Sequence, residues 1–159
     1  MATYFANVTL FDGRALKTKA GVLVANGTIS WVGAHARAPR EARAAHEVDG
    51  AGKTVTPGLI DCHVHLCFDG SADFAGEARE MTNDAVATVK AVRNAARNLE
   101  HGVTTVRDLG APGVVSIEVA RAVDRGVIPG PRILAGGPGP HHHRRARPQH
   151  RAGPGGRRS

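Results

Sequence analysis

The stretch that decides the fold is Pro57-Gly58-Leu59-Ile60-Asp61-Cys62-His63-Val64-His65. Its mostly apolar beginning, bounded by a proline, predicts a buried β-strand over residues 58–65. Residues two apart in a strand point to the same face, so His63 and His65 project together at the end of this strand. Catalytic groups of parallel α/β folds gather at that carboxyl end. Two adjacent imidazoles there can supply the first two ligands of a divalent metal site that is completed elsewhere.

A simpler interpretation of the same pair is two half-buried polar residues that bind nothing. The context favours the metal site over this alternative. The pair ends an apolar strand, follows a β-rich segment and opens an alternating strand and helix pattern. His63 and His65 are therefore the candidate metal ligands.

Downstream of the histidines, strand and helix patterns alternate. The longest helix begins at an N-cap of Thr82 or Asn83, and an apolar stripe at three-to-four spacing predicts the face that packs in the core. The order of elements predicts parallel strand pairing and right-handed crossovers. The stripe consists of Val86, Val89, Val92, Ala96 and Leu99. The expected elements are residues 58–65, 83–99, 103–106, 115–123 and 132–134.

Upstream, the sequence reads as short β-strands. Asn26-Gly27 lies between two β-rich runs and predicts a hairpin, because a type I′ turn needs positive φ at both central positions. Residues 34–45 are expected to form a loop or a short helix. We expect residues 1–57 to form a small β-sandwich-like unit. Its other expected strands are Tyr4 to Phe11, His46 to Val48 and Lys53 to Thr56.

Length and composition exclude several classes of protein. The chain has 159 residues and is 42% apolar, which is enough to bury a core and argues against a wholly disordered chain. No apolar run reaches the roughly 18 residues of a membrane span. With no export signal, Cys62 and Cys67 are expected to be free thiols in a reducing compartment. We therefore expect a cytoplasmic protein without membrane association, and the sequence leaves its oligomeric state open.

The basic charge is confined to the C-terminal tail. Residues 141–159 contain six arginines and no acidic residue, so the net charge of +7 does not mark a folded face. Residues 136–159 contain no large apolar side chain, and we expect a disordered tail. The alternative function is a basic-tailed nucleic-acid-binding module. Because no aromatic residue interleaves the arginines, we expect no specific nucleic-acid partner, and we treat His141–His143 as incidental.

Residues 57–65 and several other stretches resemble the amidohydrolase superfamily of metal-dependent hydrolases. The Pro-Gly-Leu-Ile-Asp-x-His-x-His stretch is specific when it is followed, as here, by Gly102-Val103-Thr104-Thr105. Within the superfamily the sequence is most similar to imidazolonepropionase-like and prolidase-like members. The other matching stretches are residues 7–13, 29–33, 101–108 and 130–134.

The resemblance implies a (β/α)8 barrel, a β-sandwich built from both chain ends, and one or two divalent metal ions, usually zinc. Only His63 and His65 carry over as ligands. The further ligands of the family, together with its catalytic aspartate, come from later strands. The implied activity is hydrolysis of carbon–nitrogen bonds, other than peptide links in proteins, in small amide, cyclic amide or dipeptide-like substrates. The metal would activate water and polarise the scissile carbonyl.

The chain departs from this pattern in length. A barrel needs about 200 to 250 residues, whereas residues 58–135 hold two βα units and the start of a third strand. We therefore expect an α/β fold, a partial (β/α)8 TIM barrel, as an N-terminal fragment that is inactive alone. A frameshift between Ala135 and Pro140 would explain the tail. Residues 141–147 can be encoded by codons that, when read one base later, give Thr-Thr-Thr-Gly-Gly-His. The resemblance leads us to expect a Thr-x-Thr-Gly-Gly-His stretch after the third barrel strand.

Features near the histidines leave several interpretations open. Asp61 either holds the local backbone or orients a ligand. Asp108, at the end of the second barrel strand, either lines the pocket or caps the next turn. Residues 68–80 form either a lid or an ordinary solvated loop. Cys62 is expected to face away from the histidines as a packing residue, and Cys67 is not expected to be a ligand.

Overall fold

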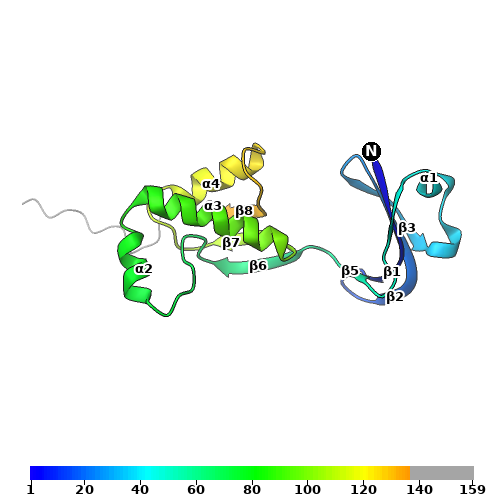
Figure 1. The fold of residues 1–159 in the computed structure, drawn as a ribbon, viewed down its shortest axis with the longest axis horizontal. Coiled ribbons are helices and arrows are strands. Elements are labelled where there is room, and N and C mark those ends of the chain that lie inside the picture. Colours follow the sequence, from blue (N-terminus) through cyan, green and yellow to red (C-terminus); the bar gives the residue numbers. More distant parts are fainter. Residues whose placement is uncertain (137–159) are drawn as a thin grey trace, which may run out of the picture. The chain divides into compact units, whose positions relative to one another are not determined.

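The computed structural model describes residues 1–136, and the expected tail therefore lies outside the described residues except for Gly136. Backbone contacts divide the chain into one unit of Met1–Pro57 and a second that begins at Gly58 (Figure 1). Each unit has its own apolar core.

The first unit is a sheet of five strands with two short helical turns. The strands β3, β2, β1 and β4 lie side by side in that order, and β5 also pairs with β1. The pairs β1–β2 and β2–β3 are antiparallel, whereas β4 and β5 both run parallel to β1. The elements are β1 (Ala2–Phe11), β2 (Leu16–Ala25), β3 (Thr28–Ala34), η1 (His35–Arg37), α1 (Arg40–Arg43), β4 (His46–Asp49) and β5 (Thr54–Val55).

The predicted hairpin is confirmed between β2 and β3. Asn26 has a φ of 50° and Gly27 a φ of 75°, so both central residues are left-handed as a type I′ turn requires. The turn joins Ala25 to its partner Thr28 in the antiparallel ladder. Local turn chemistry was sufficient to predict this feature.

The expected β-sandwich is not formed by residues 1–57, whose strands make one sheet instead of two facing sheets. The physical reason is that β1 pairs along one side with β2 and along the other first with β4 and then with β5. All five strands are thereby linked in one sheet. Two bulges interrupt the ladder between β1 and β2, and Asn7 and Lys19, with φ of 53° and 52°, lie at them.

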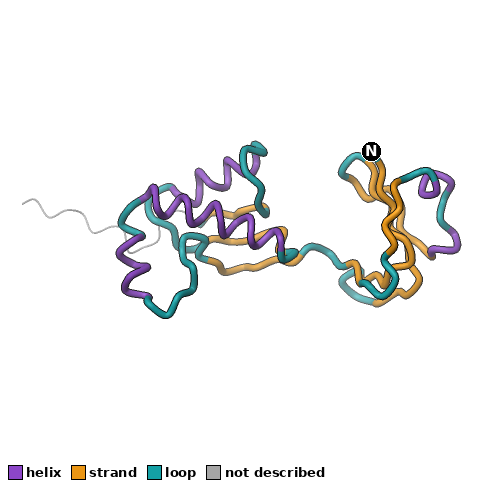
Figure 2. The backbone as a smooth tube through the Cα atoms, in the orientation of Figure 1, coloured by secondary structure: helices purple, strands orange, loops and turns teal. Residues whose placement is uncertain are grey.

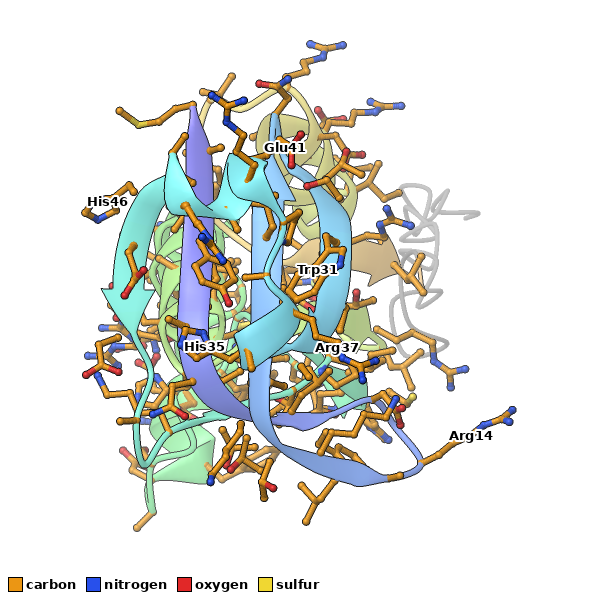
Figure 3. The ribbon with its side chains drawn as sticks, turned by 90° about the vertical axis from the view of Figure 1, so that its right-hand side faces the viewer. Arg14, Trp31, His35, Arg37, Glu41 and His46 are labelled. Carbon is orange, nitrogen blue, oxygen red and sulfur yellow. The ribbon has the colours of Figure 1, made fainter. Side chains whose placement is uncertain are left out.

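The first bulge changes which side of the sheet the residues of β1 face. Tyr4 packs with Leu23 in one apolar cluster, whereas Val8 packs with Val22 in another. Leu23 and Val22 are neighbours in β2 and so point to opposite faces. Figure 3 looks onto the face that carries α1, where Trp31 and the cluster around Tyr4 lie.

The second unit is the parallel α/β pattern that the sequence predicts. Strands β6, β7 and β8 are parallel neighbours in that order, and α3 and α4 cover one face of the sheet (Figure 2). The described residues form this open sheet of three strands and not a closed barrel. The elements are β6 (Leu59–Val64), α2 (Phe74–Glu80), α3 (Asp84–Glu100), β7 (Val103–Asp108), α4 (Val115–Asp124) and β8 (Arg132–Ala135).

Helix α3 begins where the sequence predicts but turns a different face to the core. Asn83 is its N-cap, and its Oδ1 accepts hydrogen bonds from the amides of Ala85 (3.0 Å) and Val86 (3.4 Å). The predicted stripe is wrong in part: Val89 is 71% exposed, and Val86 and Leu99 are exposed as well, whereas Val92 does pack against the core. The buried stripe consists of Ala87, Ala91 and Ala95.

Close packing and hydrogen bonding explain why α3 turns its alanine face, and not the predicted face, towards the core. Alanine side chains let α3 lie close to the sheet and to α4, where the dense core contains Val106, Val119 and Ile133. The amide of Asn94 also fixes the rotation, because its Nδ2 donates to the carbonyl oxygens of Leu66 (2.8 Å) and Phe68 (3.0 Å). Both effects arise from contacts between residues far apart in the sequence, which the spacing of apolar residues along one helix does not reveal.

Strand β6 was predicted to be buried, and the structure shows that it is exposed. Leu59 is 55% and Ile60 is 67% exposed. Within residues 1–136, β6 pairs only with β7, and only its last residue, Val64, packs against the helical core.

None of the helices among residues 1–136 is long and apolar enough to cross a membrane.

Candidate metal site

A bulge near the end of β6 places the first histidine. The ladder with β7 pairs Asp61 with Val106 and then Val64 with Asp108, so β6 carries one extra residue between these pairs. Oδ1 of Asp61 accepts a hydrogen bond of 3.0 Å from the amide of His63 inside the bulge. A bulge of this kind re-aims a side chain. Of the two roles considered for Asp61, the structure shows that it holds the local backbone.

The structure brings His63 and His65 together. Their Nε2 atoms are 3.3 Å apart, the ring centroids are separated by 5.2 Å, and the ring planes cross at 68°. Both residues are exposed. This spacing suits one neutral imidazole donating a hydrogen bond to the other.

The same spacing fits two ligands of one metal ion. Zinc takes imidazole nitrogens at about 2.0–2.1 Å in tetrahedral geometry, which puts two such nitrogens about 3.3–3.4 Å apart. The Nε2 atoms of His63 and His65 already have that separation. The distance required between two ligands of one ion is therefore present.

The described residues supply no third ligand at this site. Within residues 1–136 there is no group of three or more His, Cys, Asp or Glu side chains that could hold a metal ion. Cys67 is fully buried, and burial raises the pKa of its thiol to about 12, with a further contribution from Asp108. The thiolate is the form that binds metal, so Cys67 does not suit a ligand role. Cys62 is exposed, and its expected packing role is wrong.

The turn after β7 lies directly beside His65. Asp108 is fully buried, and its Oδ1 accepts a hydrogen bond of 3.1 Å from the amide of Gly110. Burial raises the pKa of this carboxyl group, although the Gly110 hydrogen bond and the nearby His65 act against that effect. Of the two roles considered for Asp108, capping of the turn is the one that the hydrogen bond shows.

Two aromatic side chains, Phe68 and Phe74, form a wall next to His65. The centroid of the His65 ring lies 5.8 Å from that of Phe68 in an edge-on arrangement. Phe68 in turn stacks on Phe74, with centroids 5.8 Å apart and ring planes within 11° of parallel. Phe74 is 69% exposed, so the wall presents apolar surface to solvent next to the histidines. Neither phenylalanine was predicted from the sequence as a site residue.

The loop that carries this wall is attached to α2 and α3. Asp69 forms ion pairs with Lys90, at 3.2 Å, and with Arg93. The carboxylate of Glu77 accepts a hydrogen bond of 2.7 Å from the amide of Asp69, and Asn94 holds the carbonyls at the start of the loop. Residues 68–80, considered above as a lid or a solvated loop, therefore contain α2 and are tied to α3 by these contacts, and nothing in the described residues shows that they move as a lid.

A parallel α/β sheet with polar groups at the carboxyl ends of its strands is the arrangement of the α/β-barrel enzymes. A family model described as "Amidohydrolase family" matches residues 54–153 of this chain, which include β6 and the histidine pair. The chain therefore belongs to the amidohydrolase family.

Curated relatives and solved structures agree with this family. The imidazolonepropionase of Ralstonia nicotianae is 34% identical over 120 residues, which cover 68% of this chain and 29% of that protein. A putative prolidase from Bifidobacterium longum has a TM-score of 0.66 at 33% identity, over 86% of this chain and 30% of that one. A Xaa-Pro dipeptidase has the same fold, with a TM-score of 0.71 at 24% identity over 87% and 34% of the two chains. The chain spans about 30% of the length of the relatives that it matches.

Proposed function

We propose that His63 and His65 hold a divalent metal ion, most suitably zinc, in a hydrolase that cleaves carbon–nitrogen bonds of small molecules. The observation that supports this proposal is the 3.3 Å separation of the two Nε2 atoms on exposed rings. A divalent ion held there supplies Lewis-acid polarisation of a scissile carbonyl and a source of hydroxide near neutral pH. Membership of the amidohydrolase family supports the same chemistry.

Residues of this chain have separate roles in that site. His63 and His65 bind the ion through Nε2, and Asp61 orients His63 through the backbone of the bulge. The wall of Phe68 and Phe74 contacts the apolar part of a substrate and excludes water from one side. We assign the proton transfer to the leaving nitrogen to none of the described residues, because Asp108, the carboxylate whose charge interacts with His65, is fully buried and caps its own turn.

The substrate class follows from the site and from the names of the relatives. These names point to an imidazolone and to an Xaa-Pro dipeptide, both of which are small molecules with a hydrolysable carbon–nitrogen bond. An exposed aromatic pair beside the histidines suits a substrate with a flat or apolar group. We therefore propose small amide, cyclic amide or dipeptide-like substrates.

Cobalt binding tests the metal site without requiring turnover. Because a histidine tract binds transition metals on its own, each variant would carry alanine at His141–His143. Co²⁺ titration followed by visible absorption should then show one site, and His63→Ala or His65→Ala should weaken its binding at least about tenfold. His46→Ala, which removes an exposed histidine of β4, is the matched control and should leave binding unchanged. Equal Co²⁺ binding by the His63→Ala variant would overturn the proposal.

A further inference from the structure

The ring of His65 lies against the backbone of Gly110. A Cβ atom built on Gly110 would come within 2.5 Å of Cε1 of His65 and closer still to its Nδ1. Real Cβ atoms essentially never approach other heavy atoms this closely. Gly110 is not among the glycines with positive φ, so the reason for glycine here is space and not backbone freedom.

The backbone at Gly110 is held in place and has little room to retreat. The amide of Gly110 donates to Oδ1 of Asp108, and the amide of Leu109 donates to the carbonyl of Val64, each at 3.1 Å. The carbonyl of Asp108 accepts a further hydrogen bond of 2.7 Å from the amide of Gly136. The turn is thus tied to both neighbouring strands. A side chain at position 110 would therefore displace the exposed His65 ring and not the turn.

We propose that Gly110 is a positioning residue for His65. Its missing side chain leaves the space in which the His65 ring sits with its Nε2 atom 3.3 Å from that of His63. The role of Gly110 in metal binding rests on the proposed function, whereas its control of the ring position does not. An alanine at this position tilts the ring and separates the two nitrogens, because its methyl group occupies the volume now filled by the Nδ1 edge.

The first test uses the metal-free chain. Nuclear Overhauser effects (NOEs) between the ring protons of His63 and His65, and between His65 and Gly110, should be present in the wild type. Gly110→Ala should abolish the contact between the two rings. Gly126→Ala is the control, since it also places a methyl group on a glycine of this unit, but nothing lies within 4 Å and Gly126 has a φ of 67°. Retention of the ring-to-ring contacts in Gly110→Ala would overturn the proposal.

The second test measures Co²⁺ affinity with alanine at His141–His143, as above. We expect Gly110→Ala to weaken binding about tenfold or more, as the loss of groups that orient metal ligands does, and Gly126→Ala to lower stability but not affinity. Unchanged affinity in Gly110→Ala would contradict the part of the proposal that concerns metal binding. If the wild type binds no Co²⁺ but the ring contacts are present and are lost in Gly110→Ala, the metal site fails and the positioning role stands.

A thermodynamic cycle covers the case in which Gly110→Ala does not fold. Because the clash is with the His65 ring, Gly110→Ala should be tolerated when residue 65 is also alanine. The Gly110→Ala/His65→Ala double variant should unfold at the same midpoint urea concentration as the His65→Ala single variant. If the substitution prevents folding in both backgrounds, the clash is with something other than His65 and the proposal is wrong.

Discussion

Glu77 is the buried charge that holds the loop beside the histidines. It is 6% exposed, and its Oε1 accepts hydrogen bonds from the amides of Asp69 (2.7 Å) and Ser71 (3.5 Å). These part-buried hydrogen bonds give two backbone donors of the loop a charged acceptor. Glu77 therefore helps to hold the wall formed by Phe68 and Phe74, together with Asn94 and the ion pairs of Asp69.

Removal of this carboxylate should cost more than removal of its exposed neighbour. We expect Glu77→Ala to lower the free energy of unfolding by about 1–3 kcal/mol, because two part-buried backbone donors lose their charged acceptor. Glu80 forms an ion pair with Lys90, and the Glu80 side chain is 52% exposed. Glu80→Ala should therefore lower the free energy of unfolding by less than about 1 kcal/mol. Urea denaturation of the two variants measures the difference. Equal costs would show that Glu77 does not anchor the loop.

Asp69 gives the stability of the second unit a dependence on acid pH. Burial acts to raise the pKa of its carboxyl group, but hydrogen bonds from Arg93, Asn94 and Lys90 lower it to about 2. A carboxylate with a lowered pKa stabilises the fold above its unfolded pKa of about 3.9, and this contribution is lost as the pH falls towards 2. We expect Asp69→Asn to be less stable than wild type by up to about 1 kcal/mol at pH 7. In urea denaturation the gap should narrow between pH 4 and pH 2, and a constant gap would refute this assignment.

At the scale of secondary structure, α3 separates what local sequence determines from what packing determines. The start of the helix follows from one side chain, the Asn83 cap, and was predicted. The buried face of α3 was not predicted correctly. Both the valines and the alanines of this helix recur at helical spacing, so the spacing alone does not show which of the two faces packs in the core. Contacts made by Asn94 with the carbonyls of Leu66 and Phe68 select the alanine face.

Substitutions on the two faces of α3 should differ clearly. Ala91 is fully buried against α4 and β7, and we expect Ala91→Leu to lower the free energy of unfolding by about 1–3 kcal/mol through overpacking. Val89 is 71% exposed, and Val89→Ala should change it by less than about 0.5 kcal/mol. Thermal melts of both variants test this. If Val89→Ala lowered the free energy of unfolding more than Ala91→Leu does, the face with Val89 would be the one that packs in the core, contrary to the structure.

The candidate site shows the same division. His63 and His65 could be proposed from their spacing and from their place at the end of an apolar strand, but the structure brings them together through a bulge at His63 and with His65 just beyond β6, which regular strand alternation does not predict. Gly110, Phe68 and Phe74 were missed, because each matters only through its contact with the His65 ring or with a residue that touches it. Asp61 and Asp108 were found as candidates, but hydrogen bonds were needed to choose between their roles.

At the scale of the whole molecule, the second unit presents exposed strands. Leu59, Ile60 and Leu134 are between 54% and 67% exposed, and within the described part of the chain β6 and β8 each pair with β7 alone. Unpaired strand edges with apolar side chains promote association with other chains. We therefore expect the purified chain to associate as its concentration rises.

Sedimentation velocity over a range of concentrations checks this expectation. Ile60→Lys places a charge on the exposed strand and should reduce association. Val127→Lys alters a residue that is 73% exposed but lies outside the strands, and should leave association unchanged. A monomer at all concentrations in the unmodified chain would contradict the expectation.

The function proposed for the molecule depends on one ion bound jointly by His63 and His65. Zinc X-ray absorption spectroscopy of the metal-loaded chain, with His141–His143 replaced by alanine, measures this most directly. We predict imidazole nitrogens at about 2.0–2.1 Å, with the imidazole scattering reduced in His63→Ala and reduced further in the His63→Ala/His65→Ala double variant. An unchanged zinc spectrum in the double variant would contradict the metal site.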